Sequence, residues 1–550
     1  MTNLRRYVVT HRGDSSSVLR RLQDFVRSHG TPTGEQLETL AGENALPAAA
    51  VRAALSYYAD LHGQSASLRV CRGTSCMLAG AGELFERLEP EVDCRAVYCL
   101  GYCDRSPVAL RGDDEVLVRC RPDLVLSAAR HPEVPPPPSI RCLAREPLST
   151  RRLMQGGCAR LDRARAAGAY AAVAQALRGP RADVVAALDR SGERGRGGAA
   201  YSTAAKWRAC AEAPGDTRYV IANGDEGDPG SFIDRLLMEG DPHSIIEGML
   251  LCGYAVGARE GIVFIRSEYP TAMATMEAAI AEARQAGLLG SALFGSDFDF
   301  DLSVFPGMGS YVCGEETALL NAIEGFRGEV RLRPPYPAVE GLHGKPTVVN
   351  NVETLVNVPV ILTMGAEAYA RLGTQNSSGT KALCLNHGFA RPGVVEVEFG
   401  ISLRQVIEEA GGGADGHPLA AVLVGGPMGS VVLPDQWDVP VCYTAMAARE
   451  IQLGHGGLVA VPEHADFRAL LLHWAAFMRD ESCGKCVPCR LGSGRVVDLL
   501  RGGDAAPSPQ LERLLEVIEQ GSLCAFGQLL PKPMRQLIAH FGDRIFAGRR

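Results

Sequence analysis

Two groups of cysteines, one near each end of the chain, have the spacing of iron–sulfur ligands. Near the C-terminus, three thiols are separated by two residues each, and a fourth follows farther along the chain: Cys483, Cys486, Cys489 and Cys524. Three close thiolates can hold three irons of a [4Fe–4S] cluster, and a remote thiolate holds the last one. Structural zinc usually pairs two such halves, whereas the second half here is one cysteine. Spacing therefore favours the cluster, with zinc as the alternative.

The N-terminal group consists of two pairs, and two pairs predict two irons. These cysteines are Cys71, Cys76, Cys99 and Cys103. Apolar runs at 67–70 and 95–98 are typical of short strands that deliver the pairs on adjacent loops. The pattern predicts a [2Fe–2S] centre, and a disulfide pair or a zinc knuckle remains open. Cys94 and Cys120 lie near enough in sequence to be mistaken for ligands.

Between these groups lies a glycine-rich stretch, 191–207, that closes on Lys206. A loop of this kind lets the backbone approach a phosphate or a flat ring, although alone it is as often a plain surface loop. Polar segments follow predicted strands at 223–230, 314–317 and 348–354. Because α/β sheets bind ligands at the carboxyl ends of their strands, these segments together predict a binding site.

Composition limits the class of protein. The chain has 550 residues, 46% of them hydrophobic, and a formal net charge of −7 without a long basic run. We therefore expect several domains and no nucleic-acid partner. The first residues lack an apolar signal core, and no apolar stretch has membrane-spanning length, which predicts a cytoplasmic protein without direct membrane insertion. Nine of the seventeen cysteines fall outside the two groups and are expected in the core.

The periodicity of apolar residues predicts an α/β multidomain fold. A helical lead-in precedes the first cysteine group, a proline-rich linker follows it, an alternating α/β region comes next, and a β-grasp-like sheet and a helical tail complete the chain. The expected ranges are 1–66 (helical segment), 67–130 ([2Fe–2S] domain), 131–150 (linker), 151–379 (α/β domain), 380–460 (β-grasp domain) and 461–550 (helical [4Fe–4S] domain).

The order of five motifs resembles the NADH-binding flavoprotein subunit of respiratory complex I over about 150–550. They are the glycine-rich loop, Asn-Gly-Asp-Glu, Gly-Glu-Glu-Thr, Val-Asn-Asn-Val-Glu-Thr and Ser-Cys-Gly-Lys-Cys-x-Pro-Cys-Arg. The first 130 residues resemble the smaller, thioredoxin-like [2Fe–2S] subunit of that enzyme. This fusion resembles the diaphorase subunits of soluble NAD-dependent formate dehydrogenases and NAD-reducing hydrogenases. The resemblance implies FMN and NAD(H) in a Rossmann-like domain, one [2Fe–2S] and one [4Fe–4S].

The resemblance also implies roles for individual residues. The implied FMN contacts are Gly195, Arg196, Gly197, Lys206, Asn223, Asp225, Asn350, Asn351 and Thr354. The implied NAD contacts are Tyr201, Asp228, Tyr311, Glu315 and Glu316. Two positions depart from the family: Ala200-Tyr201-Ser202 replaces Gly-Phe-Pro, and Ala209 replaces a second aromatic on the adenine side. The second departure predicts modest dinucleotide affinity, because a stacked ring contributes about 0.5–1.5 kcal/mol.

The implied function is electron transfer between NAD(H), FMN and the clusters, with no general acid or nucleophile supplied by the protein. We expect an NAD-dependent formate dehydrogenase, with an NAD-reducing hydrogenase or complex I as alternatives. The partner would be a catalytic subunit that carries further iron–sulfur clusters, either a molybdenum or tungsten formate dehydrogenase or a hydrogenase. A zinc scaffold and a self-sufficient flavin oxidoreductase are the rival hypotheses. Because no arginine adjoins the acids Asp228 and Glu316 in sequence, NAD is expected over NADP.

Overall fold

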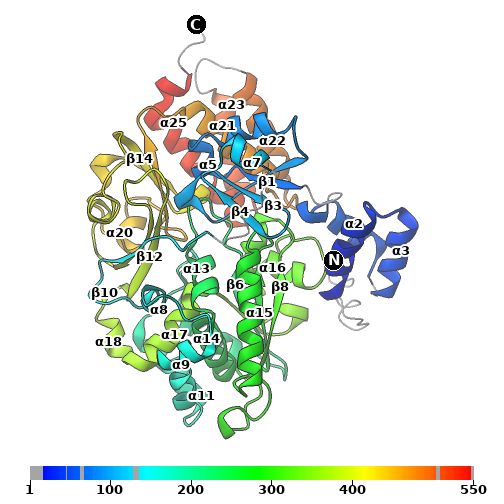
Figure 1. Cartoon of the computed structure of the whole chain (residues 1–550), viewed down its shortest axis with the longest axis vertical. Helices are drawn as coiled ribbons and strands as arrows, with labels where there is room; N and C mark the ends of the chain where they lie inside the picture. Colours follow the sequence, from blue (N-terminus) through cyan, green and yellow to red (C-terminus); the bar gives the residue numbers. More distant parts are fainter. Residues whose placement is uncertain (1–15, 45, 62–66, 128–134, 503–507, 547–550) are drawn as a thin grey trace.

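A four-stranded parallel sheet forms the centre of the α/β domain. The computed structural model describes residues 16–44, 46–61, 67–127, 135–502 and 508–546 (Figure 1). The strand order is β8-β7-β6-β9. Because β9 pairs with the edge of β6 opposite β7, the order reverses between β6 and β9, which is the switch point where such sheets bind ligands. The strands are β6 (Tyr219–Gly224), β7 (Glu260–Ile265), β8 (Asp301–Pro306) and β9 (Thr347–Asn351).

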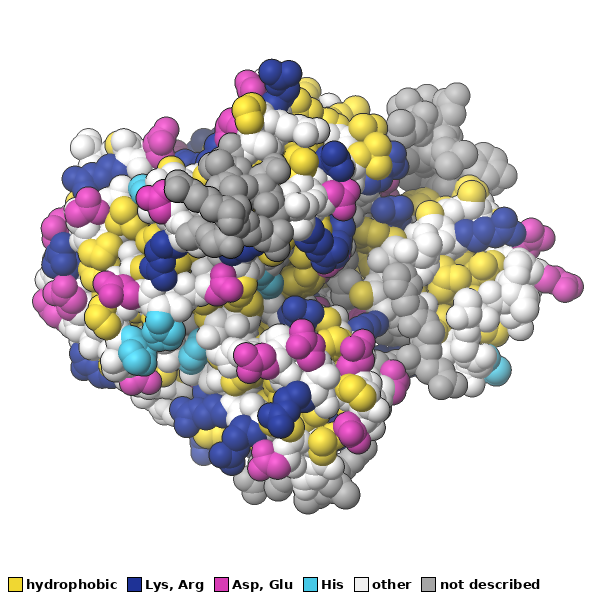
Figure 2. Space-filling view, turned by 90° about the horizontal axis from the view of Figure 1, so that it is seen from above, with side chains coloured by type: hydrophobic (Ala, Val, Ile, Leu, Met, Phe, Trp, Pro, Cys, Tyr) yellow, Lys and Arg dark blue, Asp and Glu magenta, His cyan; other side chains and the backbone are white. Residues whose placement is uncertain are grey.

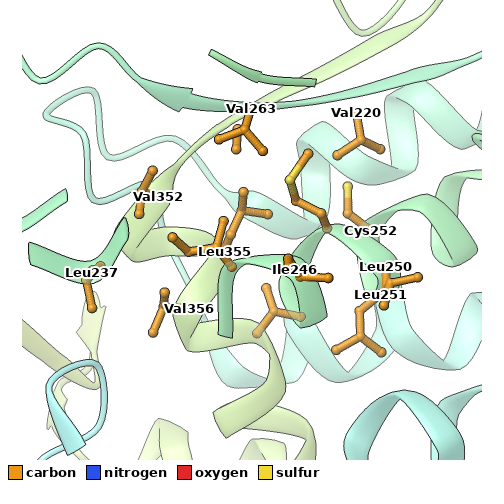
Figure 3. Packing of buried hydrophobic residues seen from close by; sticks show 14 of the residues in the cluster. Val220, Leu237, Ile246, Leu250, Leu251, Cys252, Val263, Val352, Leu355 and Val356 are labelled. Atoms are coloured by element: carbon orange, nitrogen blue, oxygen red, sulfur yellow. The ribbon is translucent and has the colours of Figure 1, made fainter. Parts of the chain in front are cut away.

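Alternate residues of β6 enter two different cores, as expected for a strand covered on both faces. Val220 and Ala222 pack with α14 (Pro242–Val256) and α17 (Val352–Met364). Figure 3 shows Ile246 and Leu250 beside residues of α17 such as Leu355. The two helices approach so closely that a Cβ on Gly248 would lie 2.2 Å from the Leu355 carbonyl oxygen. Glycine at this position therefore permits the contact.

The N-terminal helices help to cover the other face of the sheet. Tyr219 and Ile221 of β6 pack with α16 (Glu316–Ile323) and with the lead-in. The Tyr58 hydroxyl donates to the Phe326 carbonyl at 2.7 Å and fixes the end of the lead-in there. Figure 1 shows α2 and α3 projecting from the body of the protein. The lead-in consists of α2 (Ser16–His29), α3 (Gly34–Glu43), α4 (Ala48–Leu55) and η1 (Ala59–Leu61).

The first cysteine group lies in a small α/β unit whose sheet has the order β2-β1-β3-β4. Strands β1 and β2 are parallel neighbours, so the loops that follow them leave the same edge of the sheet. This confirms the predicted strands at 67–70 and 95–98. The elements are β1 (Leu68–Cys71), α5 (Thr74–Leu78), α6 (Ala81–Leu88), β2 (Cys94–Val97), η2 (Cys103–Arg105), β3 (Val108–Arg111), β4 (Glu115–Val118) and α7 (Pro122–Leu126).

The mixed six-stranded sheet extends farther than the predicted β-grasp segment. Its order is β15-β14-β16-β12-β13-β5, and β5 comes from the expected linker. The buried Glu396 carboxylate accepts hydrogen bonds from the backbone N–H groups of Leu148, Ser149 and Thr150, which fixes the chain after β5. His131–Val134 of that linker lie outside the described residues. The strands are β5 (Ile140–Cys142), β12 (Thr380–Leu385), β13 (Gly393–Glu398), β14 (Leu419–Val424), β15 (Ser430–Val432) and β16 (Gly457–Pro462).

Helices form the C-terminal part of the fold, as predicted. No helix of the described residues is long and apolar enough to cross a membrane. Figure 2 shows the face above these helices, where acidic and basic side chains are interspersed and hydrophobic ones lie among them. The helices are α21 (Phe467–Asp480), α22 (Val487–Gly502), α23 (Pro509–Gly521), α24 (Ala525–Leu529) and α25 (Pro531–Phe546).

The remaining helices surround the α/β domain and the six-stranded sheet. The helix predicted at 402–410 is divided into α19 (Leu403–Gln405) and a π-helical turn η6 (Val406–Ala410). Strands β10 (Gly373–Thr374) and β11 (Ser377–Ser378) form an antiparallel β-hairpin. The others are α8 (Arg151–Met154), α9 (Leu161–Ala166), α10 (Ala171–Ala176), α11 (Arg181–Ser191), α12 (Thr203–Glu212), α13 (Ile233–Gly240), α15 (Pro270–Gln285), α18 (Ala366–Ala370) and α20 (Tyr443–Ala447).

Candidate functional site

The predicted FMN residues meet at the switch point of the parallel sheet. Asn223 at the end of β6 is in register with Asn351 at the end of β9. Asn351 also caps α17, since its side chain accepts a hydrogen bond from the Thr354 N–H. The N-terminus of this 13-residue helix attracts anions, so a phosphate group is favoured here.

The glycine-rich loop lies directly over this helix start. A Cβ on Gly197 would lie 3.0 Å from the Asn351 Cβ, so glycine allows the close approach. The Arg196 N–H donates to the Thr354 hydroxyl at 2.9 Å. The Arg196 side chain is 1% exposed and pairs with Glu193, under the loop. The Arg196 side chain is therefore held inside the protein, and its backbone N–H contacts the first turn of α17.

Lys206 and Asn350 are held by neighbours in the domain. The Lys206 ammonium donates to the Val349 carbonyl at 2.9 Å and lies 3.1 Å from the Glu316 carboxylate. The Asn350 side-chain oxygen accepts a hydrogen bond from the Trp207 indole at 2.7 Å. Lys206 thus joins the predicted FMN and NAD residues in one site.

Two buried carboxylate oxygens beside Gly314 test whether a cofactor fits. Asp225 Oδ2 and Glu315 Oε1 have no hydrogen-bond partner among the described residues. Burial raises the pKa of Asp225 well above its ordinary value. A buried polar atom without a partner is costly in a folded protein. Arg333 Nη1 lies 3.6 Å from Glu315 Oε1, so Asp225 Oδ2 is the oxygen that most needs a donor, and the ring or hydroxyl donors of FMN can supply one. The residues present therefore fit a flavin site.

The predicted NAD residues come from the glycine-rich loop, from the segment after β6 and from the segment 311–316 at the start of α16. Tyr311 donates its hydroxyl proton to the Asp228 carboxylate. Glu315 caps α16, and Glu316 lies at the start of that helix. Tyr201 is 59% exposed. Ala209, where the family has an aromatic, is exposed on α12.

The expectation that no arginine accompanies Glu316 is wrong. Arg333 Nη1 lies 3.1 Å from the Glu316 carboxylate and 3.6 Å from that of Glu315. The same guanidinium lies 6.0 Å from the ring centre of Tyr336, whose side chain is 58% exposed. Arg333 lies 17 positions after Glu316 in the sequence, so a search for arginines next to Glu316 could not predict this ion pair.

The N-terminal cysteines form two pairs on adjacent loops. The Cys76 thiol hydrogen-bonds to Cys71, which lowers the pKa of Cys71 to about 7. The sulfurs of Cys99 and Cys103 lie 3.7 Å apart. A shared iron requires two thiolates at about this separation, so the geometry fits one pair on each iron of a [2Fe–2S] centre. Cys94 and Cys120 pack in a different apolar cluster from Cys71 and Cys76.

The segment 225–230 after β6, named the dinucleotide loop, contacts the N-terminal cysteines. The Gly230 N–H donates to the Cys103 sulfur at 3.3 Å, and the Cys99 sulfur lies 3.8 Å from the Asp228 carbonyl oxygen. The Tyr269 ring packs so closely on Gly101 that a Cβ there would lie 2.5 Å from it. The [2Fe–2S] ligands thus lie at the interface with the α/β domain.

The C-terminal cysteines gather between helices. Cys483 and Cys486 lie before α22, Cys489 in its first turn, and Cys524 immediately before α24. Burial raises the pKa of Cys489 to about 12 and that of Cys524 to about 11. Thiols in such surroundings lose their protons when a metal binds.

The described thiol sulfurs are not arranged as in a preformed zinc site. A tetrahedral zinc ion with bonds of about 2.3 Å holds its four sulfurs about 3.8 Å apart. Among the described residues, no three thiol sulfurs lie within 4.8 Å of one another. All seventeen cysteines are free. The two groups, whose cysteines are all described, therefore contain no disulfide and no preformed zinc tetrahedron, and Cys99 and Cys103 have the separation of two thiolates on one iron.

Comparisons with known proteins agree with this geometry. The profile of the Nuo51 FMN-binding domain matches residues 188–360, and that of the NADH-ubiquinone oxidoreductase-F iron–sulfur binding region matches 469–547. A thioredoxin-like [2Fe–2S] ferredoxin profile matches 4–129, and an SLBB domain profile matches 389–432. The chain is 43% identical to the NADP-reducing hydrogenase subunit HndC of Solidesulfovibrio fructosivorans, over 68% of this chain and 77% of that protein.

The chain belongs to the family that contains HndC and the F subunits of NADH-quinone oxidoreductases. It is 40% identical to an NADH-quinone oxidoreductase subunit of Rhizobium meliloti, over 68% of this chain and 91% of the relative. The solved structure of an NAD+-reducing [NiFe]-hydrogenase in the H2-reduced state matches it with a TM-score of 0.83 and 29% identity, over 97% of this chain and 93% of that one. The chain is thus an NADH-binding diaphorase module with FMN, a [2Fe–2S] and a [4Fe–4S].

Some residues of the site were missed from the sequence. Arg333 and Tyr336 follow Gly-Glu-Glu-Thr in the run Arg-Leu-Arg-Pro-Pro-Tyr, whose basic and aromatic residues beside prolines were the only signal. Buried His455 contacts Glu226 and Asp234 below the loop, and a lone histidine between glycines gave no local signal. The individual FMN and NAD contacts stay predictions.

Proposed function

We propose that this subunit exchanges electrons with a partner protein through the [4Fe–4S] cluster. The observation that supports this exit is the exposure of large apolar side chains beside the C-terminal cysteines. Val487 is 57% exposed, Leu491 61% and Leu523 43%, next to Cys486, Cys489 and Cys524 in sequence. Val487 and Leu491 lie four residues apart on one face of α22, and exposed apolar groups that lie together mark protein interfaces. The N-terminal cysteines, in contrast, are buried against the α/β domain.

The chemistry divides between the cofactors and the protein. FMN accepts two electrons as a hydride from NADH and can pass them on singly to a cluster. The protein holds and orients the rings. The flavin binds at Asn223, Asn351 and the start of α17. The dinucleotide binds beside Glu316, which pairs with Lys206 and Arg333. The [4Fe–4S] ligands lie in a separate helical unit that packs against the dinucleotide side, since Glu481 accepts a hydrogen bond from the Tyr311 N–H at 2.9 Å.

Two electron donors are candidates for the partner. A molybdenum or tungsten formate dehydrogenase is the first candidate, because the [2Fe–2S] domain and the flavoprotein domain are fused in one chain. A hydrogenase is the second candidate, because the NAD+-reducing [NiFe]-hydrogenase matches 97% of this chain, including the fused N-terminal part. In both cases the partner subunit carries further iron–sulfur clusters, and the complex works in the cytoplasm, where the NAD pool lies.

Anaerobic co-purification with the native complex tests the proposal. The isolated chain should oxidise NADH with ferricyanide or a viologen but should show no activity toward formate or hydrogen. The intact complex should reduce NAD+ with one of the two donors. Oxidation of formate by the isolated chain would contradict the electron-exit proposal. Reduction of NAD+ by hydrogen but not by formate would replace the first candidate with the second.

A further inference from the structure

A glycine-flanked histidine enters the flavin site from the six-stranded sheet. His455 lies in the segment Gly454–Gly457, just before β16, and its side chain is buried, with 5% exposure. A Cβ on Gly198 of the glycine-rich loop would lie 3.4 Å from Gly454. A Cβ on Gly457 would lie 2.8 Å from Gly230. The segment thus lies between the glycine-rich loop and the dinucleotide loop.

Both ring nitrogens of His455 face carboxylates. Nδ1 lies 3.2 Å from Glu226 Oε1, and Nε2 lies 2.9 Å from Asp234 Oδ2. The Asn351 amide nitrogen lies 3.0 Å from Nε2 and 2.6 Å from the same Asp234 oxygen. The histidine therefore connects the dinucleotide loop, α13 and the cap of α17, which all line the flavin site.

The arrangement favours a charged ring. A neutral imidazole has one N–H donor, so it would leave a lone pair against one of the two carboxylates. The two acids raise the pKa of His455 well above its ordinary value, against the opposing effect of burial. The nearby cations are engaged elsewhere, since Arg235 pairs with Glu239 and Lys381 with Glu353. His455 is therefore the cation that offsets Glu226 and Asp234.

We propose that His455 is a positioning residue for FMN, a buried imidazolium that pairs with Glu226 and Asp234, shares the Asp234 carboxylate with the Asn351 amide, and lets the site tolerate the added negative charge of reduced flavin. Reduction by a hydride brings two electrons and one proton, so the flavin gains one negative charge. Without the cation, two carboxylates would face that charge with no compensation at short range. The inference rests on FMN binding by this family and not on the identity of the partner.

A divalent metal ion at the same three side chains is the competing interpretation. The carboxylates and the ring lie close enough to hold one. However, the two ring nitrogens face different carboxylates, and one ion can bind only one nitrogen of a histidine. The imidazolium lies within ion-pairing distance of both carboxylates at once, 3.2 Å from Glu226 and 2.9 Å from Asp234.

FMN release from the purified protein tests the proposal without turnover. Wild type, His455→Gln and His455→Lys are diluted under air-oxidised and under dithionite-reduced conditions, and released FMN is measured by its fluorescence after filtration and reoxidation. In His455→Gln, the dissociation constant of reduced FMN should rise about tenfold more than that of oxidised FMN. For a two-electron couple, this ratio corresponds to a midpoint potential lower by about 30 mV. His455→Lys, which retains the charge, should recover most of the difference.

Controls separate charge from folding and from metal binding. His417→Gln changes an exposed histidine just before β14 and should leave the dissociation constants of oxidised and of reduced FMN unchanged. If His455→Gln fails to fold, His455→Gln combined with Asp234→Asn removes one acid with the cation and should restore the wild-type ratio. Equal weakening of oxidised and reduced FMN would overturn the proposal and leave a structural role. A stoichiometric divalent metal besides iron, lost in His455→Gln, would also overturn it.

Discussion

Arg333 Nη1 lies 3.1 Å from the Glu316 carboxylate, although the two residues come from different segments of the dinucleotide site. Lys206 lies 3.1 Å from the other oxygen of the same carboxylate. The acid that should repel a 2′-phosphate is therefore held between two cations. Because these cations offset its charge, we expect a narrower preference for NAD over NADP than the acid alone would give.

Neutralising Glu316 should favour NADPH. In Glu316→Gln, Arg333 and Lys206 become free to contact a 2′-phosphate, and the preference should shift by about 1–3 kcal/mol toward NADPH. Steady-state kcat/KM for NADH and NADPH measures the shift. Glu340→Gln, an exposed carboxylate on the following loop, is the matched control and should change neither value. If the ratio does not move in Glu316→Gln, the discriminating charge lies elsewhere, and Asp228 is the next residue to change.

The two cysteine groups should be separable by EPR. Cys524→Ser should abolish or convert the [4Fe–4S] signal and leave FMN bound, because Cys524 and the flavin residues belong to different domains. Cys71→Ser should affect only the [2Fe–2S] signal. Cys94→Ser is the control, since Cys94 packs in a separate cluster beside the first group and should leave both signals intact. An unchanged [4Fe–4S] signal in Cys524→Ser would show that another residue is the fourth ligand.

The cysteines and the strand-end motifs were readable from sequence because their chemistry is local. Cys483, Cys486 and Cys489 must reach one cluster from one turn of chain, so their spacing encodes the site. His455 and Arg333 reach the site only through the tertiary fold, and no periodicity records such contacts. Strand β5 was also missed, because a run of three half-buried residues carries no alternation that distinguishes it from a linker.

Gly248→Ala should destabilise the α/β domain. The added Cβ would lie 2.2 Å from the Leu355 carbonyl oxygen, so α14 and α17 must separate. Overpacking of this kind costs about 1–3 kcal/mol or more. Gly494→Ala makes the same change in α22, where no atom lies within 4 Å, and should stabilise its helix by about 0.5–1 kcal/mol. Calorimetry of both variants measures the difference, and equal unfolding temperatures would contradict the close helix contact.

Mild acid should destabilise the domain through His243. Burial lowers the pKa of this histidine to about 4, below its usual value of about 6.5. Between these values the unfolded chain binds a proton that the folded protein does not, so stability is present above pH 6.5 and falls as the pH drops toward 4. At about 1.4 kcal/mol per pKa unit, the loss of stability from pH 6.5 to pH 4 is about 3 kcal/mol. We expect the free energy of unfolding in urea to fall less between pH 7.5 and pH 4.5 in His243→Gln than in wild type. If it falls equally in both proteins, groups other than His243 cause the loss of stability.

Removing the Tyr201 ring should weaken dinucleotide binding without slowing hydride transfer. The ring is 59% exposed, and the position of the second family aromatic is taken by Ala209, so Tyr201 should carry the adenine contact. Loss of a stacked ring removes about 0.5–1.5 kcal/mol, which predicts a KM for NADH about 2- to 13-fold higher in Tyr201→Ala. A rise in KM at constant kcat is the signature of a contact made equally in the ground and transition states. Tyr201→Phe retains the ring and should behave as wild type with ferricyanide as acceptor. If Tyr201→Ala leaves KM unchanged, Tyr336, which is 58% exposed beside Arg333, becomes the adenine contact, and Tyr336→Ala should then show the rise instead.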